Sequence, residues 1–120
     1  MNATSSISRD WRLHLDDLIG AAEKIGRLVA GRSLAQWQAD EAAVDAVLFN
    51  PQVIGESLKR LPAERLAELP ESHRRDPIRL RDLIAHRYFA LEASVIHDAA
   101  TRHVPDLSAH ALKLRDHSRD

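Results

Sequence analysis

Residues 73–88 hold the densest group of side chains that could take part in chemistry. Five arginines stand against two aspartates there, an excess of three positive charges in a chain whose formal net charge is −1. The same segment contains His86 and the only tyrosine, Tyr88. Guanidinium groups form paired hydrogen bonds with phosphate oxygens, so such a local patch could bind nucleic acid even though the whole chain carries no basic field. The alternative is a charged helix with an apolar face toward the core.

Helical spacing distributes the polar side chains of this segment over different sides. At about 100° per residue, Leu80, Leu83 and Ile84 share one face, which we expect to be the core face. Arg81 and His86 then project about 140° apart. These two side chains can converge only if the helix ends near His86, or if a second copy of the chain packs alongside.

The seven histidines raise the question of a metal site. His103, His110 and His117 recur every seven residues, but seven residues rise about 10.5 Å along a helix, too far for one ion to bridge. Pro105 also interrupts the register. Cysteine is absent, which excludes disulfides and thiolate metal sites. Glycine-rich phosphate loops, nucleophile elbows and H-E-x-x-H pairs are absent from the sequence as well. We therefore expect no metal and no cofactor.

The apolar residues recur at steps of three and four, which predicts an all-α fold. A long helix is expected from Ser8 until Gly31 ends it, and a second over residues 41–60, capped by Ser33 or Asp40. Asn50-Pro51 predicts a kink or a break in the second helix, because proline removes a backbone hydrogen bond. The other expected elements are a connector at 62–76 with one short helix, and helices from Asp76-Pro77 to about Tyr88, from Leu91 to His103 before Pro105, and from Asp106 onward.

Length and composition indicate one helical domain over residues 1–120, with 1–7 and 117–120 frayed. The 120 residues include 44% hydrophobic and 29% charged side chains, which is typical of a globular protein. Few aromatic and few turn-forming residues argue against a sheet protein. The longest uncharged stretch, residues 46–55, is about half of a membrane span, and no secretory signal is visible. These features predict a cytoplasmic protein without membrane contact.

The chain resembles a known family through several motifs in order. Arg81-x4-His86-x-Tyr88 matches the R-x4–6-H-x-Y motif of HepT-like toxins, which belong to the HEPN superfamily of small helical ribonucleases. Together the resemblance covers residues about 10–105, although the stretch before the arginine, at 76–80, lacks the Trp and Gly-Met pair that members often carry. The further matching motifs are Asp40-Glu41, Asp45-Ala46-Val47-Leu48, Asn50-x-x-x-Ile54-Gly55-Glu56, Lys59-Arg60-Leu61-Pro62 and Tyr88-Phe89.

The resemblance implies a HEPN-type bundle of four main helices plus short extra helices, which forms a homodimer. It also implies metal-independent RNA cleavage, with Arg81 and His86 as catalytic residues. Asp82 would support His86 through an i,i+4 contact, although an ordinary surface pair explains this spacing equally well. Four further arginines would bind the RNA backbone, unless each is simply a solvated surface residue: Arg74, Arg75, Arg79 and Arg87.

The resemblance further implies a type VII toxin–antitoxin pair. The partner would be an MntA-like minimal nucleotidyltransferase that silences the toxin by AMPylation of Tyr88, and the substrate would be tRNA or mRNA. A half-buried Tyr88 with its hydroxyl in water is the structural alternative. A different class of function also remains open, in which the chain is a non-catalytic helical interaction module that binds a nucleotidyltransferase and its substrate.

Overall fold

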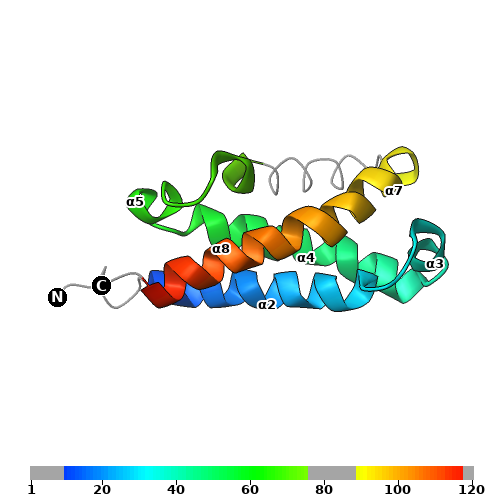
Figure 1. Ribbon diagram of the computed structural model, residues 1–120, viewed down its shortest axis with the longest axis horizontal. Helices are drawn as coiled ribbons and strands as arrows, with labels where there is room; N and C mark the ends of the chain where they lie inside the picture. The colour runs from blue at the N-terminus through cyan, green and yellow to red at the C-terminus, as the bar shows by residue number, and fades with distance from the viewer. Residues whose placement is uncertain (1–9, 76–88, 118–120) are drawn as a thin grey trace.

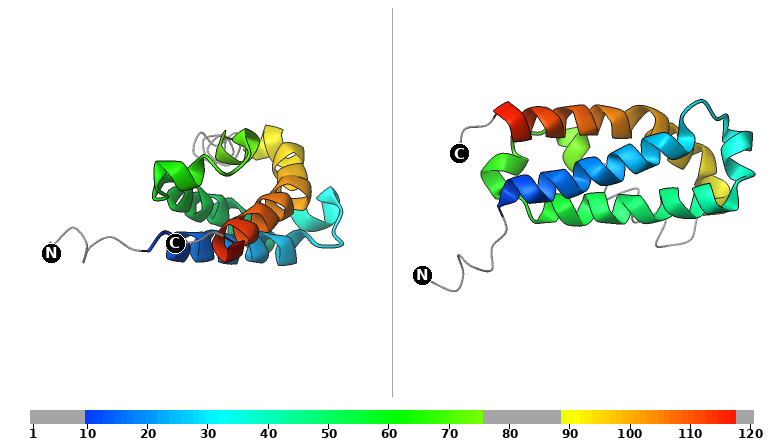
Figure 2. Two further views of the ribbon diagram at one scale, coloured as in Figure 1. Left: turned by 60° about the vertical axis from the view of Figure 1, so that its left-hand side comes forward. Right: turned by 90° about the horizontal axis from the view of Figure 1, so that it is seen from below.

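The described part of the computed structural model comprises residues 10–75 and 89–117, and it contains helices and no strand. Three long helices, α2 (Trp11–Val29), α4 (Glu41–Lys59) and α8 (Val104–His117), lie side by side along the long axis of the molecule (Figures 1 and 2). The predicted all-α fold is confirmed. The shorter elements are α3 (Leu34–Gln38), α5 (Ala63–Leu66), α7 (Phe89–Asp98) and the π-helical turn η1 (Ala99–His103).

Side-chain caps set the beginnings of three helices. Asp10 accepts a hydrogen bond from the backbone N–H of Arg12, so α2 begins at Trp11, and Ser8, the expected first residue, lies outside the described residues. Ser33 and Asp40 were alternatives for one helix, but each caps its own: Ser33 forms a capping box at α3, and Asp40 caps α4. A short helix that the sequence pattern had not shown therefore lies between them.

The hydrophobic core forms where α2 packs against α4 and α8. Gly31 adopts a φ of 69°, a left-handed conformation that favours glycine, and it allows the chain to turn away after α2, as predicted. The side chains with the least exposure come from all three long helices, α3 and α7. The largest of the fully buried side chains are Trp37, Leu15, Leu18, Ile25, Ile54, Leu58, Ile96 and Leu107.

Helix α4 runs through Pro51 without a break. A proline inside a helix costs about 3 kcal/mol, because it removes one hydrogen bond and clashes with the preceding turn. Val47, Ile54 and Leu58 are almost fully buried on the same helix, and each such side chain contributes about 1.5–3 kcal/mol. Packing thus outweighs the local cost of Pro51, and the predicted break does not occur.

The helix expected to stop before Pro105 instead continues. After Asp98 the backbone widens into the π-helical turn η1, and α8 follows directly, with Pro105 as its second residue. Proline is tolerated in a first helical turn, and the wider turn before it relaxes the clash with preceding carbonyls. The chain from α7 to α8 is therefore one bent helical path (Figure 1). Among the described helices, none is both long and apolar enough to cross a membrane.

Candidate functional site

The motif segment, residues 76–88, connects residues 71–75 to α7. Most of the predicted site lies outside the described residues. The two catalytic residues, the supporting residue, the modified tyrosine and two of the four RNA-binding arginines therefore stay predictions. The residues concerned are Arg79, Arg81, Asp82, His86, Arg87 and Tyr88. The structure does describe both flanks of the motif segment, and it shows which contacts hold each of them.

The flank before the motif segment is attached to α8 through His73. Residues 71–75 are helical, and the Nε2–H of the buried His73 ring donates a hydrogen bond of 2.6 Å to Oδ2 of Asp106. A carboxylate can only accept, so the shared proton resides on Nε2 of the ring. This hydrogen bond holds the pKa of Asp106 below its ordinary value. His73 therefore ties the residues just before the motif segment to an ionised carboxylate.

The flank after the motif segment is attached differently. His97 of α7 donates a 3.0 Å hydrogen bond from Nε2 to the backbone carbonyl of Arg32, in the turn between α2 and α3. Its ring lies 5.6 Å from the ring of Trp37, tilted by 40°. Trp37 is fully buried. A backbone carbonyl and an aromatic ring thus position α7, and neither of them is ionisable.

Arg74 and Arg75 are the two predicted RNA-binding arginines that the structure describes. Arg75 is exposed, whereas Arg74 is half-buried, and its Nε is shielded from solvent with no hydrogen-bond partner among the described residues. Consecutive arginines therefore stand in unlike environments at the entrance to the motif segment. RNA binding by either side chain remains a prediction.

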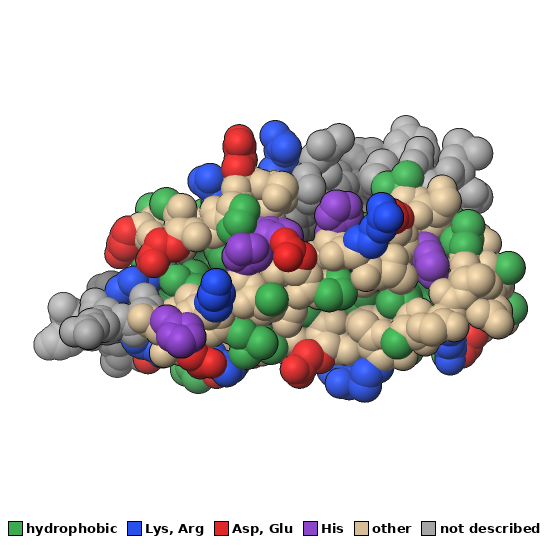
Figure 3. Space-filling view, in the orientation of Figure 1, with side chains coloured by type: hydrophobic (Ala, Val, Ile, Leu, Met, Phe, Trp, Pro, Cys, Tyr) green, Lys and Arg blue, Asp and Glu red, His purple; other side chains and the backbone are tan. Residues whose placement is uncertain are grey.

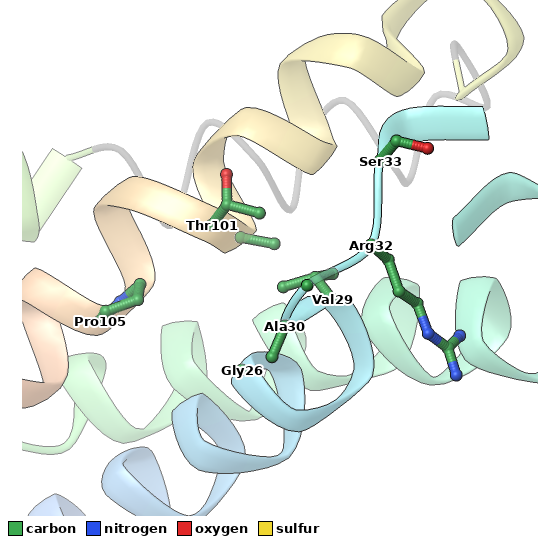
Figure 4. A pocket seen from close by; sticks show the side chains of 9 residues that line it. Gly26, Val29, Ala30, Arg32, Ser33, Thr101 and Pro105 are labelled. Atoms are coloured by element: carbon green, nitrogen blue, oxygen red, sulfur yellow. The ribbon is translucent and has the colours of Figure 1, made fainter. Parts of the chain in front are cut away.

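A hollow of about 500 Å³ opens between the end of α2 and η1 (Figure 4). Its polar side chains are already engaged. The hydroxyl of Thr101 donates to the carbonyls of His97 and Asp98, at 3.0 and 3.2 Å. The guanidinium of Arg32 extends away from Thr101 and pairs with Asp40 at 3.1 Å. No set of polar groups converges in this hollow, and we assign it no chemistry.

Sequence reasoning missed the convergence of His73 with α8. It weighed His110 only with His103 and His117, at spacings that no single ion could bridge. The structure instead places Nε2 of His110 at 3.6 Å from Oδ2 of Asp106, one helical turn before it. This i,i+4 spacing was visible in the sequence. His73, the third side chain that meets here with Asp106 and His110, lies 33 residues before Asp106, and no local spacing indicates that pairing.

Comparisons with known proteins agree with this architecture. The sequence model of the family described as "Ribonuclease HepT-like" matches residues 18–114. "Putative RNase MJ0127" of Methanocaldococcus jannaschii is 28% identical over 98 residues, which cover 82% of this chain and 81% of that protein. "Probable ribonuclease HepT" of Thermococcus cleftensis is 27% identical over 109 residues, which cover 91% and 99%. No solved structure matches the chain with significance.

The family match extends from within α2 to within α8, and so includes the three long helices, both flanks and the motif segment between them. The sequence motifs implied a helical bundle and a family resemblance carried by Arg81, His86 and Tyr88. The family model, which matches most of the chain independently of these motifs, agrees with both. The chain belongs to the HepT-like ribonuclease family.

Proposed function

We propose that this chain is a ribonuclease toxin of a type VII toxin–antitoxin system, which cleaves cytoplasmic tRNA or mRNA without a metal ion. The observation that carries the proposal is the family match over residues 18–114. Within that range, Arg81, His86 and Tyr88 occur at the spacing of the family's R-x4–6-H-x-Y motif. The names of the two relatives, which describe ribonucleases, support the same activity.

The proposed reaction needs one base and several fixed positive charges. His86 takes the proton of a ribose 2′-hydroxyl, because an imidazole titrates near neutral pH. The 2′-oxygen forms a bond to the adjacent phosphorus, and the bond from phosphorus to the 5′-oxygen breaks as that oxygen takes up a proton. Arg81 stabilises the charge on the phosphate oxygens in the transition state. Arg75, which is exposed, would contact the RNA backbone together with Arg74, Arg79 and Arg87.

A homodimer completes the site in this proposal. On one straight helix Arg81 and His86 project about 140° apart, so a second copy of the motif segment is needed to bring both kinds of group to one phosphate. Each cleft would then be composite. Asp82, one helical turn before His86, would orient the imidazole as a positioning residue.

The cleavage test compares four variants of the purified chain on total RNA in excess EDTA. Arg81→Ala and His86→Ala should each lower the cleavage rate by about 100-fold or more, the usual contribution of such groups. Arg102→Ala and His103→Ala are matched controls at exposed positions of η1, and they should cleave at the wild-type rate.

Three results would count against the proposal. Cleavage that survives His86→Ala removes the imidazole as the base. Cleavage that stops in EDTA and returns with a divalent ion contradicts the metal-free chemistry. A folded wild-type chain that cleaves no RNA, but binds a nucleotidyltransferase, identifies the chain as the non-catalytic interaction module instead.

The proposed control of the toxin acts at Tyr88. A partner of the minimal nucleotidyltransferase class would catalyse attack by the tyrosine oxygen on the α-phosphorus of ATP, with pyrophosphate as the leaving group. On a helix Tyr88 lies about 20° from Arg81, so the attached phosphodiester would occupy the same side as the phosphate-binding guanidinium. The modified side chain would thereby exclude RNA.

Intact-mass measurement after co-expression with such a nucleotidyltransferase tests this control. Mass additions of AMP size are expected in the wild type and should disappear in Tyr88→Phe. Growth inhibition that the partner still relieves in Tyr88→Phe, with no mass addition in the wild type, would instead indicate that the partner masks the site by binding.

A further inference from the structure

Three side chains that bind metals well converge beside α8, outside the motif segment. The nearest donor atoms of His73, Asp106 and His110 all lie within 4.8 Å of one another. Two of these distances are 2.6 Å from His73 and 3.6 Å from His110, both to Oδ2 of Asp106. The two imidazole rings lie 5.2 Å apart. On the face drawn in Figure 3, histidine and acidic side chains adjoin one another over α8.

These separations are close to those of a tetrahedral metal site. Bonds of about 2.0–2.1 Å to zinc at tetrahedral angles place neighbouring donor atoms about 3.4 Å apart. The contact between His110 and Asp106 is already at that distance, and the contact between His73 and Asp106 would open by less than about 1 Å. The donor atoms of His73 and His110 lie at most 4.8 Å apart and would close by up to about 1.4 Å, which rotation of the partly exposed His110 side chain on α8 can supply.

The exposure of the three side chains also suits an ion. The His73 side chain is 8% exposed and fixed in place, whereas those of Asp106 and His110 are 63% and 39% exposed. An ion could therefore enter from solvent and keep a water molecule as its fourth ligand. His110 also borders an open hollow of about 300 Å³. Two imidazoles with one carboxylate favour zinc and its neighbours in the transition series over magnesium, which prefers six oxygen ligands.

The geometry points to a binding site for one zinc-class divalent cation, formed by His73, Asp106 and His110. On binding, Nε2 of His73 gives up its proton and donates its lone pair to the metal, while the ring carries its one remaining proton on Nδ1 and so stays a neutral imidazole. The ion would link residues 71–75 to α8, and so would fix the chain three residues before the motif segment begins. It supplies no reacting group, and this inference is independent of the proposed nuclease activity.

Zinc binding to the whole chain, with any polyhistidine tag removed, tests the inference by isothermal titration calorimetry. We expect one zinc ion per chain in the wild type and a rise in melting temperature. His110→Ala should weaken zinc binding by at least tenfold and leave the metal-free melting temperature nearly unchanged, because that side chain is partly exposed. His103→Ala, an exposed histidine that precedes α8, is the matched control and should bind zinc like the wild type. Magnesium should give no heat of binding.

A second measurement keeps the test decisive if His110→Ala does not fold. The visible absorption of Co²⁺ added to the wild type should show the intense bands of a four-coordinate ion, and excess zinc should remove them. Absence of zinc binding to the wild type, equal affinity in His110→Ala, or only the weak spectrum of six-coordinate Co²⁺ would overturn the site.

Loss of the zinc site and loss of the nuclease proposal are distinguishable. RNA cleavage is measured with His110→Ala in EDTA. This variant lacks one ligand of the proposed zinc site, so its cleavage rate cannot depend on zinc bound there. Retained cleavage there with zinc binding in the wild type supports both inferences. Retained cleavage with no zinc binding in the wild type rejects the zinc site alone.

Discussion

His73 and His97 hold the two flanks of the motif segment through partners of different chemistry, which lie on α8 for His73 and on α3 and the turn before it for His97. His97 contacts a fully buried tryptophan and a backbone carbonyl. His73 contacts a largely exposed carboxylate and a second imidazole, that of His110. The first set of contacts we name the aromatic joint, and the second the polar joint. Both rings donate from Nε2, so the hydrogen bond alone does not distinguish them.

The difference between the two joints indicates that the groups around a histidine ring, rather than its hydrogen bond, decide the role of that histidine. Among the described residues, no second metal-ligating side chain joins His97 in a cluster, and the ring donates its Nε2 proton to a backbone carbonyl, which is a poor ligand for a transition metal. In the polar joint the neighbours of the ring are themselves metal ligands. The aromatic joint is therefore expected to act through packing, and the polar joint through charge and coordination.

The largest effect is expected from Trp37→Ala, which removes the centre of the aromatic joint. Loss of a fully buried tryptophan costs about 3–5 kcal/mol in the free energy of unfolding, because a cavity remains that neighbours cannot fill. Urea denaturation measures this loss. Trp11→Ala is the matched control: Trp11 is partly buried with the guanidiniums of Arg12 and Arg65 over its ring, so it should cost clearly less. Equal losses of unfolding free energy in Trp37→Ala and Trp11→Ala would show that Trp37 is not the centre of the aromatic joint.

The next effect is expected from His97→Ala. The variant loses the ring contact with Trp37 and leaves the Arg32 carbonyl without its donor, which together cost about 1–3 kcal/mol. His97→Phe should recover the ring contact but not the hydrogen bond, and so should fall between alanine and the wild type. His103→Ala, at an exposed site, should change the unfolding free energy by less than about 0.5 kcal/mol. If His97→Ala costs no more than this control, the aromatic joint does not stabilise the fold.

Local sequence signals were enough for the long helices. Asp40 and Ser33 are good caps on chemical grounds, and Gly31 is the residue that a left-handed helix end requires. The break that the local rule allows at Pro51 does not occur, and the helix end that it predicts before Pro105 does not occur either. Burial of the α4 face outweighs the cost of the first proline, and a wider helical turn accommodates the second. The first compensation comes from tertiary packing rather than from neighbours in the sequence.

The candidate site was predictable in a more limited way. Arg81, His86 and Tyr88 could be named because their spacing is a short-range pattern that a family resemblance can carry. The joints could not, because His73 and Asp106 are 33 residues apart and His97 and Arg32 are 65 apart. Such pairs meet only in the folded chain, where α7 packs against α3 and α8 packs against α2, and residue spacing does not encode that packing.

The smallest effect concerns an ionisable group at the edge of the aromatic joint. Arg32, whose carbonyl binds His97, also directs its guanidinium to Asp40. The pKa of Asp40 is lowered from 3.8, first by the backbone N–H of Ala43 and then by Arg32. A carboxyl whose pKa is lower in the folded state stabilises that state fully above its ordinary pKa, and this contribution disappears as the pH falls through the folded value. The wild type should therefore lose stability in acid through Asp40.

Asp40→Ser isolates this contribution, because serine keeps an oxygen for the Ala43 N–H but cannot ionise. The difference in urea midpoint between wild type and Asp40→Ser should be constant above about pH 5 and should shrink as the pH falls below about 4. Asp106 is present in both proteins, so the titration of the polar joint cancels in this difference. A difference that stays constant through the acid range would show that the charge of Asp40 adds nothing, and that the aromatic joint acts through packing and neutral hydrogen bonds alone.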